Sequence, residues 1–169
     1  MSEMNGYAIV LRAVRGLNAA KSWTGKTHVI KSLYIASTKA DLPFEFVLFK
    51  HGPYSFDAND AIESMSAIGV LEMMATPPYG VRLKPGRTAT SVRTEIEPQI
   101  VDAIDSAIRL VGESDVKALE AIATSVWVHE KKHVNSENEW QQEVQNLKPH
   151  LDKDLIADAI KRARTFLTN

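Results

Sequence analysis

A five-residue segment near position 130 contains two histidines and a glutamate whose spacing could serve a metal site. His129-Glu130-Lys131-Lys132-His133 matches the H-E-x-x-H pattern. On a helix, this spacing places two imidazoles on one face for zinc, with the glutamate beside them as a general base. Here, however, two lysines would lie beside a dication, and the residues that follow match no extended zinc-protease pattern. We expect a polar loop or frayed helix end over 129–138 with no metal, and keep a zinc hydrolase using His129 and His133 as an alternative.

No other pattern in the sequence predicts catalysis. The chain has no phosphate-binding loop, no Gly-x-Ser-x-Gly elbow and no cysteine to serve as a thiolate nucleophile. It also lacks a pair of carboxylates in an apolar frame that would separate their acidities. The sequence therefore predicts a non-enzymatic protein without a cofactor.

A turn-rich segment near position 52 could instead bind a partner. His51 and Tyr54 flank Gly52-Pro53, and exposed aromatic side chains in a short rigid loop are plausible anchors for another protein. A structural interpretation is simpler: Pro53 fixes the turn, Tyr54 packs on the core and Ser55 caps the next helix, all without a partner.

The helix expected after Ser55 is acidic. It carries Asp57, Asp60 and Glu63 and no lysine or arginine before Gly69. Phosphates would repel this face, so we do not expect the helix to enter the major groove of DNA. The candidate partner-binding residues, for another protein, are therefore His51, Tyr54, Asp57, Asp60 and Glu63.

Basic residues gather further along the chain. Arg82, Lys84, Arg87 and Arg93 lie on an expected hairpin and the connector after it. They could hold phosphates, which would make the protein a DNA-binding regulator that contacts DNA through a basic wing, as a homodimer. The alternative is an ordinary solvated surface.

Charge and composition limit the classes of partner. The net charge of −1 supplies no general attraction toward nucleic acid or anionic lipid. With no run of about 18 apolar residues and no basic-then-apolar N-terminus, we expect a soluble protein without a membrane partner. The lack of cysteine fits the cytoplasm.

The elements that must position these residues are mainly helices. Apolar spacing and caps predict a first helix over 7–20, a second capped by Thr27 and stopped by Leu42-Pro43, and a third from Ser55 to Gly69. Aromatic residues 44–49 predict an extended segment that runs into a turn-rich junction at 50–54. Two short strands at 70–74 and 81–84 form the expected hairpin, and four more helices follow, near 100–111, 114–126, 140–147 and 155–167.

This order of elements defines the expected fold class. Helix, helix, helix, hairpin is the winged-helix order, so we predict a mostly α protein with a small β-hairpin, a winged helix-turn-helix domain and a C-terminal helical extension. The winged-helix-like domain would span residues 1–90, and the extension over 91–169 would pack on it, or the two would form one single domain.

Short motifs in the first half of the chain resemble a known family. The sequence Gly52-Pro53-Tyr54-Ser55, between an apolar extended stretch and a capped helix, resembles the YwgA-like family of bacterial small proteins, which looks distantly related to the SocA-like (Panacea) antitoxins. The resemblance covers 25–84 best and is weaker beyond. It implies a winged-helix-like fold, no known catalytic residues and, by the more distant analogy, neutralisation of a partner protein, as in antitoxin-like or phage-defence-associated regulators. The motifs that carry it are Gly25-Lys26-Thr27, Phe44-Glu45-Phe46-Val47-Leu48, His51-Gly52-Pro53-Tyr54-Ser55 and Val70-Leu71-Glu72.

Overall fold

The computed structural model describes residues 3–93 and 95–169 and is mostly helical, with two small antiparallel hairpins. The helices are α1 (Glu3–Ala19), α2 (Lys26–Ser37), α3 (Phe56–Ala67), α4 (Pro98–Val111), α5 (Val116–Lys132), α6 (Glu137–Leu147) and α7 (Lys153–Thr168), with a 3-10 turn η1 (Ala89–Ser91). The strands are β1 (Val47–Phe49), β2 (Gly52–Tyr54), β3 (Leu71–Ala75) and β4 (Val81–Pro85). The prediction of a mostly α protein with a β-hairpin is confirmed.

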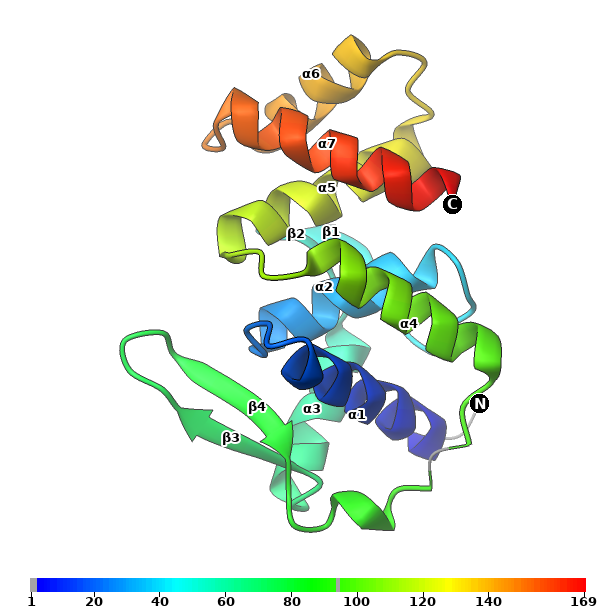
Figure 1. Ribbon diagram of the computed structural model, residues 1–169, viewed down its shortest axis with the longest axis vertical. Helices are drawn as coiled ribbons and strands as arrows, with labels where there is room; N and C mark the ends of the chain where they lie inside the picture. The colour runs from blue at the N-terminus through cyan, green and yellow to red at the C-terminus, as the bar shows by residue number, and fades with distance from the viewer. Residues whose placement is uncertain (1–2, 94) are drawn as a thin grey trace.

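The elements are stacked along the long axis of the molecule (Figure 1). Helices α6 and α7 pack on α5 at one end, while α1, α3 and the β3–β4 hairpin lie at the other, and α2 and α4 lie between them. The β1–β2 hairpin contacts both α2 and α5. Segments before and after residue 91 are therefore in direct contact, and the division into residues 1–90 and 91–169 stays a prediction.

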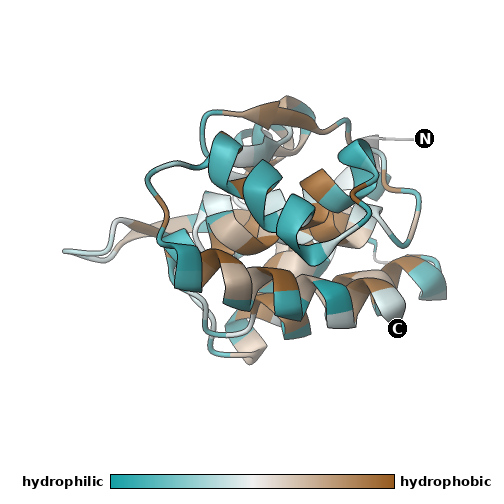
Figure 2. Ribbon diagram, turned by 90° about the horizontal axis from the view of Figure 1, so that it is seen from above, coloured by the Kyte–Doolittle hydropathy of each residue, from teal (hydrophilic) through white to brown (hydrophobic). Residues whose placement is uncertain are grey.

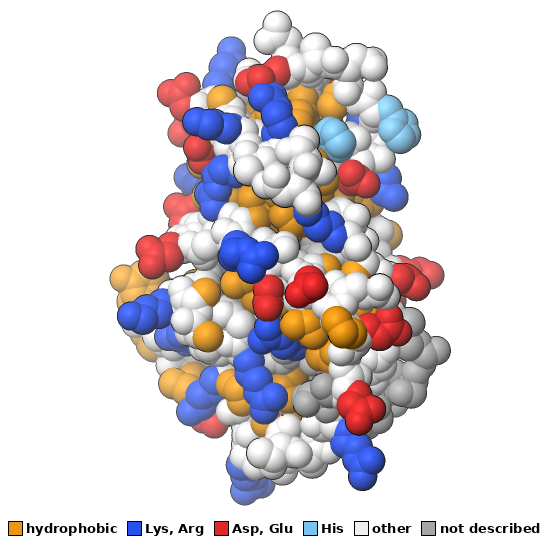
Figure 3. All heavy atoms as spheres, turned by 45° about the vertical axis from the view of Figure 1, so that its right-hand side comes forward, with side chains coloured by type: hydrophobic (Ala, Val, Ile, Leu, Met, Phe, Trp, Pro, Cys, Tyr) orange, Lys and Arg blue, Asp and Glu red, His pale blue; other side chains and the backbone are white. Residues whose placement is uncertain are grey.

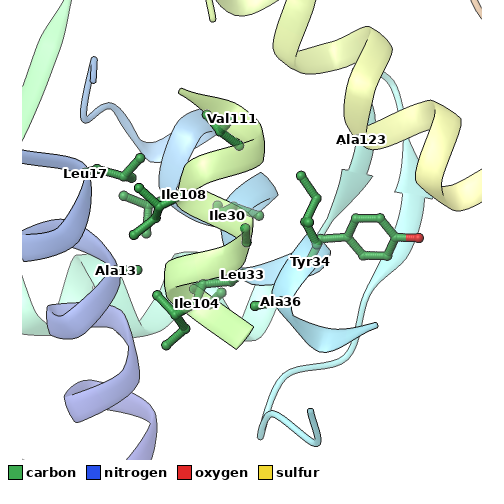
Figure 4. Packing of buried hydrophobic residues seen from close by; sticks show 14 of the residues in the cluster. Ala13, Leu17, Ile30, Leu33, Tyr34, Ala36, Ile104, Ile108, Val111 and Ala123 are labelled. Atoms are coloured by element: carbon green, nitrogen blue, oxygen red, sulfur yellow. The ribbon is translucent and has the colours of Figure 1, made fainter. Parts of the chain in front are cut away.

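The core follows from the spacing of apolar residues along the helices. Apolar and polar residues alternate along them (Figure 2), as expected for amphipathic helices. Where α1, α2 and α4 meet, Leu17, Ile30, Leu33, Ile104 and Ile108 pack together (Figure 4). Buried side chains from all seven described helices belong to this one cluster.

Several local signals are confirmed. The Ser55 side chain accepts a hydrogen bond from the backbone N–H of Ala58 at 3.1 Å and so caps α3. Gly69 follows the end of α3 with a φ of +78°. The second hairpin pairs β3 with β4 from Leu71 opposite Pro85 to Ala75 opposite Val81.

The predicted cap of the second helix is wrong. Helix α2 begins at Lys26, its N-cap is Gly25, and Thr27 lies inside the first turn. A Cβ at position 25 would lie 2.8 Å from the indole nitrogen of Trp23, so packing selects glycine there. No side chain caps this helix.

The turn-rich junction at 50–54 is in part a strand. Gly52, Pro53 and Tyr54 form β2, which pairs with β1 so that Val47 lies opposite Tyr54 and Phe49 opposite Gly52. Lys50 and His51 form the connecting turn. The predicted turn is therefore confirmed for these two residues only. Proline is tolerated in a short edge strand, so Pro53 can lie in β2 opposite Leu48.

The predicted polar loop from 129 to 138 is also wrong over much of its length. Helix α5 continues through Lys132, and His133 ends it with a left-handed φ of +51°. Val128 is buried, and the His129 ring lies 5.0 Å from the Trp140 ring. These contacts hold the last turn, so only residues 133–136 remain outside helices, and Ser136 caps α6.

None of the helices in the described part of the chain has the length and apolar character needed to cross a membrane.

Candidate functional site

Three aromatic rings from neighbouring elements meet at the surface. Phe49 in β1, Tyr54 in β2 and Phe56 at the start of α3 have ring centroids 5.1 to 5.8 Å apart. Phe49 and Phe56 are each 55% exposed, whereas Tyr54 is half-buried and also packs against the core. We call Phe49, Tyr54 and Phe56 the aromatic cluster. Edge-to-face contacts of Phe56 with Phe49 and Tyr54 fix the rings, so a partner would meet a preformed apolar surface.

Strand β1 carries two further exposed apolar side chains. Val47 and Leu48 in β1 are also exposed. On the face of the molecule shown in Figure 3, hydrophobic side chains reach the surface in separate patches between charges of both signs. The aromatic cluster differs from scattered exposure because its rings contact one another, and contiguous apolar surface is typical of interaction sites.

An acidic face adjoins the aromatic cluster. Asp57, Asp60 and Glu63 on α3 are all exposed, which is the orientation that a docking role requires. The Asp57 carboxylate accepts a hydrogen bond from the backbone N–H of Glu45 at 3.3 Å, and Glu63 forms an ion pair with Lys26. Asp60 has no ion pair within the described residues.

The predicted residues come together in part. Tyr54 contacts Phe56, the residue that precedes Asp57 at the start of α3. His51 lies in the exposed turn between β1 and β2. Sequence reasoning missed Phe49 and Phe56, which carry most of the exposed ring surface. Their signal was the strand alternation around Phe49 and a phenylalanine directly after a helix cap.

Three buried charges support the hairpin from below, and none was predicted. The Lys31 ammonium of α2 donates to the carbonyl oxygen of Pro53 at 3.1 Å, and the Lys148 ammonium donates to that of Lys50 at 2.9 Å. Lys148 also lies 2.8 Å from Oε1 of Glu120 on α5. Each of these three side chains belongs to a residue no more than 5% exposed. The half-exposed His150 lies 3.4 Å from the other Glu120 oxygen.

Burial and mutual charge shift the acidities of this group. Burial lowers the pKa of Lys31, the Glu120 carboxylate raises it and Lys148 lowers it, and together they place it at about 8. Burial alone would raise the pKa of Glu120, but the hydrogen bonds and charges of Lys148 and His150 lower it on balance. The carboxylate therefore remains ionised beside the Lys148 ammonium and the His150 ring.

Gly52 is required where the hairpin approaches these charges. Its φ is +95°, and a Cβ there would lie 3.0 Å from the Thr124 hydroxyl and 3.4 Å from the Lys31 nitrogen. The glycine thus lets the hairpin backbone lie directly on α2 and α5. The sequence could have indicated a buried Lys31, because residues on every side of it from Val29 to Ile35 are apolar or small.

The four basic candidates do not all remain free. Arg82 donates to Oδ1 of Asn18 at 3.2 Å, and Lys84 lies 3.3 Å from Glu72 across the β3–β4 pair. Arg87 and Arg93 are exposed after the end of β4. Two of the four cations are therefore already engaged within the protein.

The metal candidates lie at the end of α5. His129 belongs to the last turn, and His133 takes the left-handed conformation that ends the helix, so the two imidazoles do not share a regular helical face. Among the residues that the structure describes, no group of three histidine, aspartate or glutamate side chains could hold a metal ion.

No protein-family model matches the chain, and no curated protein matches it.

Proposed function

We propose that this protein is a non-enzymatic interaction module that binds another protein through the aromatic cluster and the acidic face of α3. The observation that carries this proposal is the exposure of Phe49 and Phe56, each 55% exposed, beside three exposed carboxylates. Aromatic side chains dominate binding energy at the centre of protein interfaces, and charged residues at the rim guide association. The partner would present an apolar centre with basic residues around it.

The arrangement of elements supports a winged-helix interpretation of the first half. Helices α1, α2 and α3 are followed by the β3–β4 hairpin, which is the winged-helix order. The β1–β2 hairpin lies in the connection between α2 and α3 and brings Phe49 and Tyr54 beside α3. In this proposal the module acts as an antitoxin-like or defence-associated regulator, and its third helix is used for protein recognition.

The alternative of DNA binding through Arg82, Lys84, Arg87 and Arg93 has less support. The first two are engaged with Asn18 and Glu72, so binding phosphates would require exchanging those contacts. The exposed acidic face of α3 would also repel a duplex placed against it.

Comparative affinity capture tests the proposal. Tagged wild-type protein, the double variant Phe49→Ser/Phe56→Ser and the control Val116→Ser would be used to capture proteins from the same cells. Val116 is 53% exposed on α5, so its replacement removes an apolar side chain of the same fractional exposure away from the site. We expect a defined partner that wild type and control retain and the double variant loses. A partner retained equally by all three would contradict the proposed surface.

A further inference from the structure

A small aromatic pocket lies between the end of α2, the loop that follows it and the last turns of α5. It encloses about 280 Å³. Its walls include the rings of Tyr34, Phe44, Phe46 and Trp127, and carboxylates at its edge come from Asp41 and Glu130. The sequence separates these residues by almost a hundred positions, and only the packing of α5 against α2 brings them together.

The rings are arranged around Tyr34. Its centroid is 5.5 Å from that of Phe46, at an interplanar angle of 64°, and 5.6 Å from that of Trp127. In Figure 4, the Tyr34 ring leaves α2 on the side away from α1 and α4, with its hydroxyl at the outer end. The negative faces of such rings attract cations, most strongly when water is excluded.

The Tyr34 hydroxyl is an unsatisfied polar group at this pocket. Tyr34 is 4% exposed, and its hydroxyl has no hydrogen-bond partner in the described part of the chain. A buried hydroxyl without a partner is costly, and such groups in native proteins call for an explanation such as a bound ligand. A donor inside the pocket would satisfy it.

The charges around the pocket favour a cation. Asp41 and Glu130 are exposed, and neither has an ion pair with a lysine or arginine among the described residues. Helix α2 ends at Ser37 and α5 at Lys132, so two negative helix ends lie nearby. One cation is present already, since the Lys131 nitrogen lies 5.5 Å from the Trp127 ring centroid.

We propose that this pocket binds an organic cation, the guanidinium or alkylammonium group of a small molecule or of a protein side chain. The rings would contact the apolar part and the faces of the cation, Glu130 and Asp41 would supply the countercharge, and the Tyr34 hydroxyl would accept a hydrogen bond. Lys131 would compete with the ligand for the Trp127 ring. This site is separate from the aromatic cluster and does not depend on the function proposed for it.

Titration with matched probes tests the site. n-Butylguanidinium and the neutral n-butylurea have nearly the same shape but differ in charge. We would follow the indole N–H signals of the three tryptophans by NMR, with Trp23 and Trp140 as internal references. We expect butylguanidinium to shift the Trp127 signal saturably and butylurea to leave it unchanged. Arginine capped at both ends serves as the protein side-chain probe: its binding indicates a protein source, and binding of butylguanidinium alone indicates a small molecule.

Variants distinguish binding from general attraction. Glu130→Gln should weaken butylguanidinium binding at least threefold, and Tyr34→Phe should weaken it while leaving the ring in place. Lys131→Gln should strengthen it, because the competing cation is removed. Glu113→Gln, an exposed glutamate on the α4–α5 connection, should have no effect. The proposal is overturned if butylurea binds equally, if butylguanidinium gives no saturable shift, or if Lys131→Gln weakens binding.

Discussion

At the scale of single residues, the main finding is a group of buried charges beneath a surface hairpin. Lys31 and Lys148 donate to backbone carbonyls of Pro53 and Lys50, and Glu120 lies against Lys148. Buried ammonium groups and carboxylates are costly to desolvate, so each requires a partner. Here the partners are backbone carbonyls of the hairpin and, for Lys148 and Glu120, the opposite charge. The position of the aromatic cluster therefore depends on the ionisation of the side chains beneath the hairpin.

Replacing the carboxylate should be costly for folding. Glu120→Gln would leave Lys148 and Lys31 as buried cations without a countercharge, and we expect a loss of about 3–5 kcal/mol in the free energy of unfolding. Urea denaturation measures this loss. The matched control Glu113→Gln, at an exposed position, should change stability by less than about 0.5 kcal/mol. A loss below about 1 kcal/mol for Glu120→Gln would show that the pair contributes little.

Lys31 should give the protein an unusual dependence on alkaline pH. The folded-state pKa of Lys31 is about 8, against an ordinary value of 10.5. Between these values the unfolded chain keeps a proton that the folded protein has released, so the free energy of unfolding rises with pH. We expect a rise of about 2 kcal/mol from pH 8 to pH 10, from about 1.4 kcal/mol for each pH unit.

Chemical denaturation across this pH range measures the effect. Lys31→Met should remove the rise, and the control Lys117→Met, at an exposed position on α5, should keep it. Above pH 10 the trend should weaken, because burial and the Glu130 charge raise the pKa of Tyr34 and the unfolded chain then loses that proton first. A flat or falling stability in wild type between pH 8 and pH 10 would contradict this account.

At the scale of elements, the start or end of a helix can be predicted from the sequence where the contacts that determine it are local. Ser55 and Gly69 are read correctly as the start and stop of α3, because a cap acts within three residues. The cap of the second helix cannot be predicted in this way, since Gly25 is selected by its packing against Trp23. Helix α5 ends later than the sequence predicts, because His129 after Val128 contacts Trp140, a residue of the next helix.

The candidate site shows the same limit. Tyr54 and the carboxylates of α3 could be predicted, because a turn motif and a charge pattern are visible in the sequence. The pairing of Phe49 with Phe56 could not, since it depends on strand register and on how β1 approaches α3. Lys31, Glu120 and Lys148 are separated by long stretches of chain and meet only in the folded protein.

Two glycines with positive φ allow the stability cost of backbone strain to be distinguished from the cost of a packing clash. Gly80→Ala, in the exposed β3–β4 loop, changes a residue with φ of +99° and no neighbour within 4 Å of the added Cβ. We expect it to cost about 1 kcal/mol from backbone strain alone. Gly52→Ala has nearly the same φ but meets Thr124 and Lys31, so it should cost at least 1 kcal/mol more, about 2–3 kcal/mol in total. Thermal denaturation compares the two, and equal losses would show that the hairpin tolerates displacement from α5.

At the scale of the whole molecule, the parts cooperate to present one surface. The C-terminal helices α6 and α7 cover α5, and the segment after α6 supplies Lys148, which reaches the β1–β2 hairpin. The N-terminal helices supply Lys31 and the helix that carries the acidic face. The aromatic cluster is therefore supported from both halves of the chain, which gives a binding surface a fixed shape before a partner arrives.

The most direct test of this account is the affinity of the captured partner for purified variants, measured by calorimetry. Phe56→Ser should raise the dissociation constant about 30-fold, as expected for a central aromatic contact of about 2 kcal/mol. Asp60→Asn should raise it less and reduce its dependence on salt, while Val116→Ser should leave it unchanged. A dissociation constant within twofold of wild type for Phe56→Ser would contradict the claim that this protein binds its partner through the aromatic cluster.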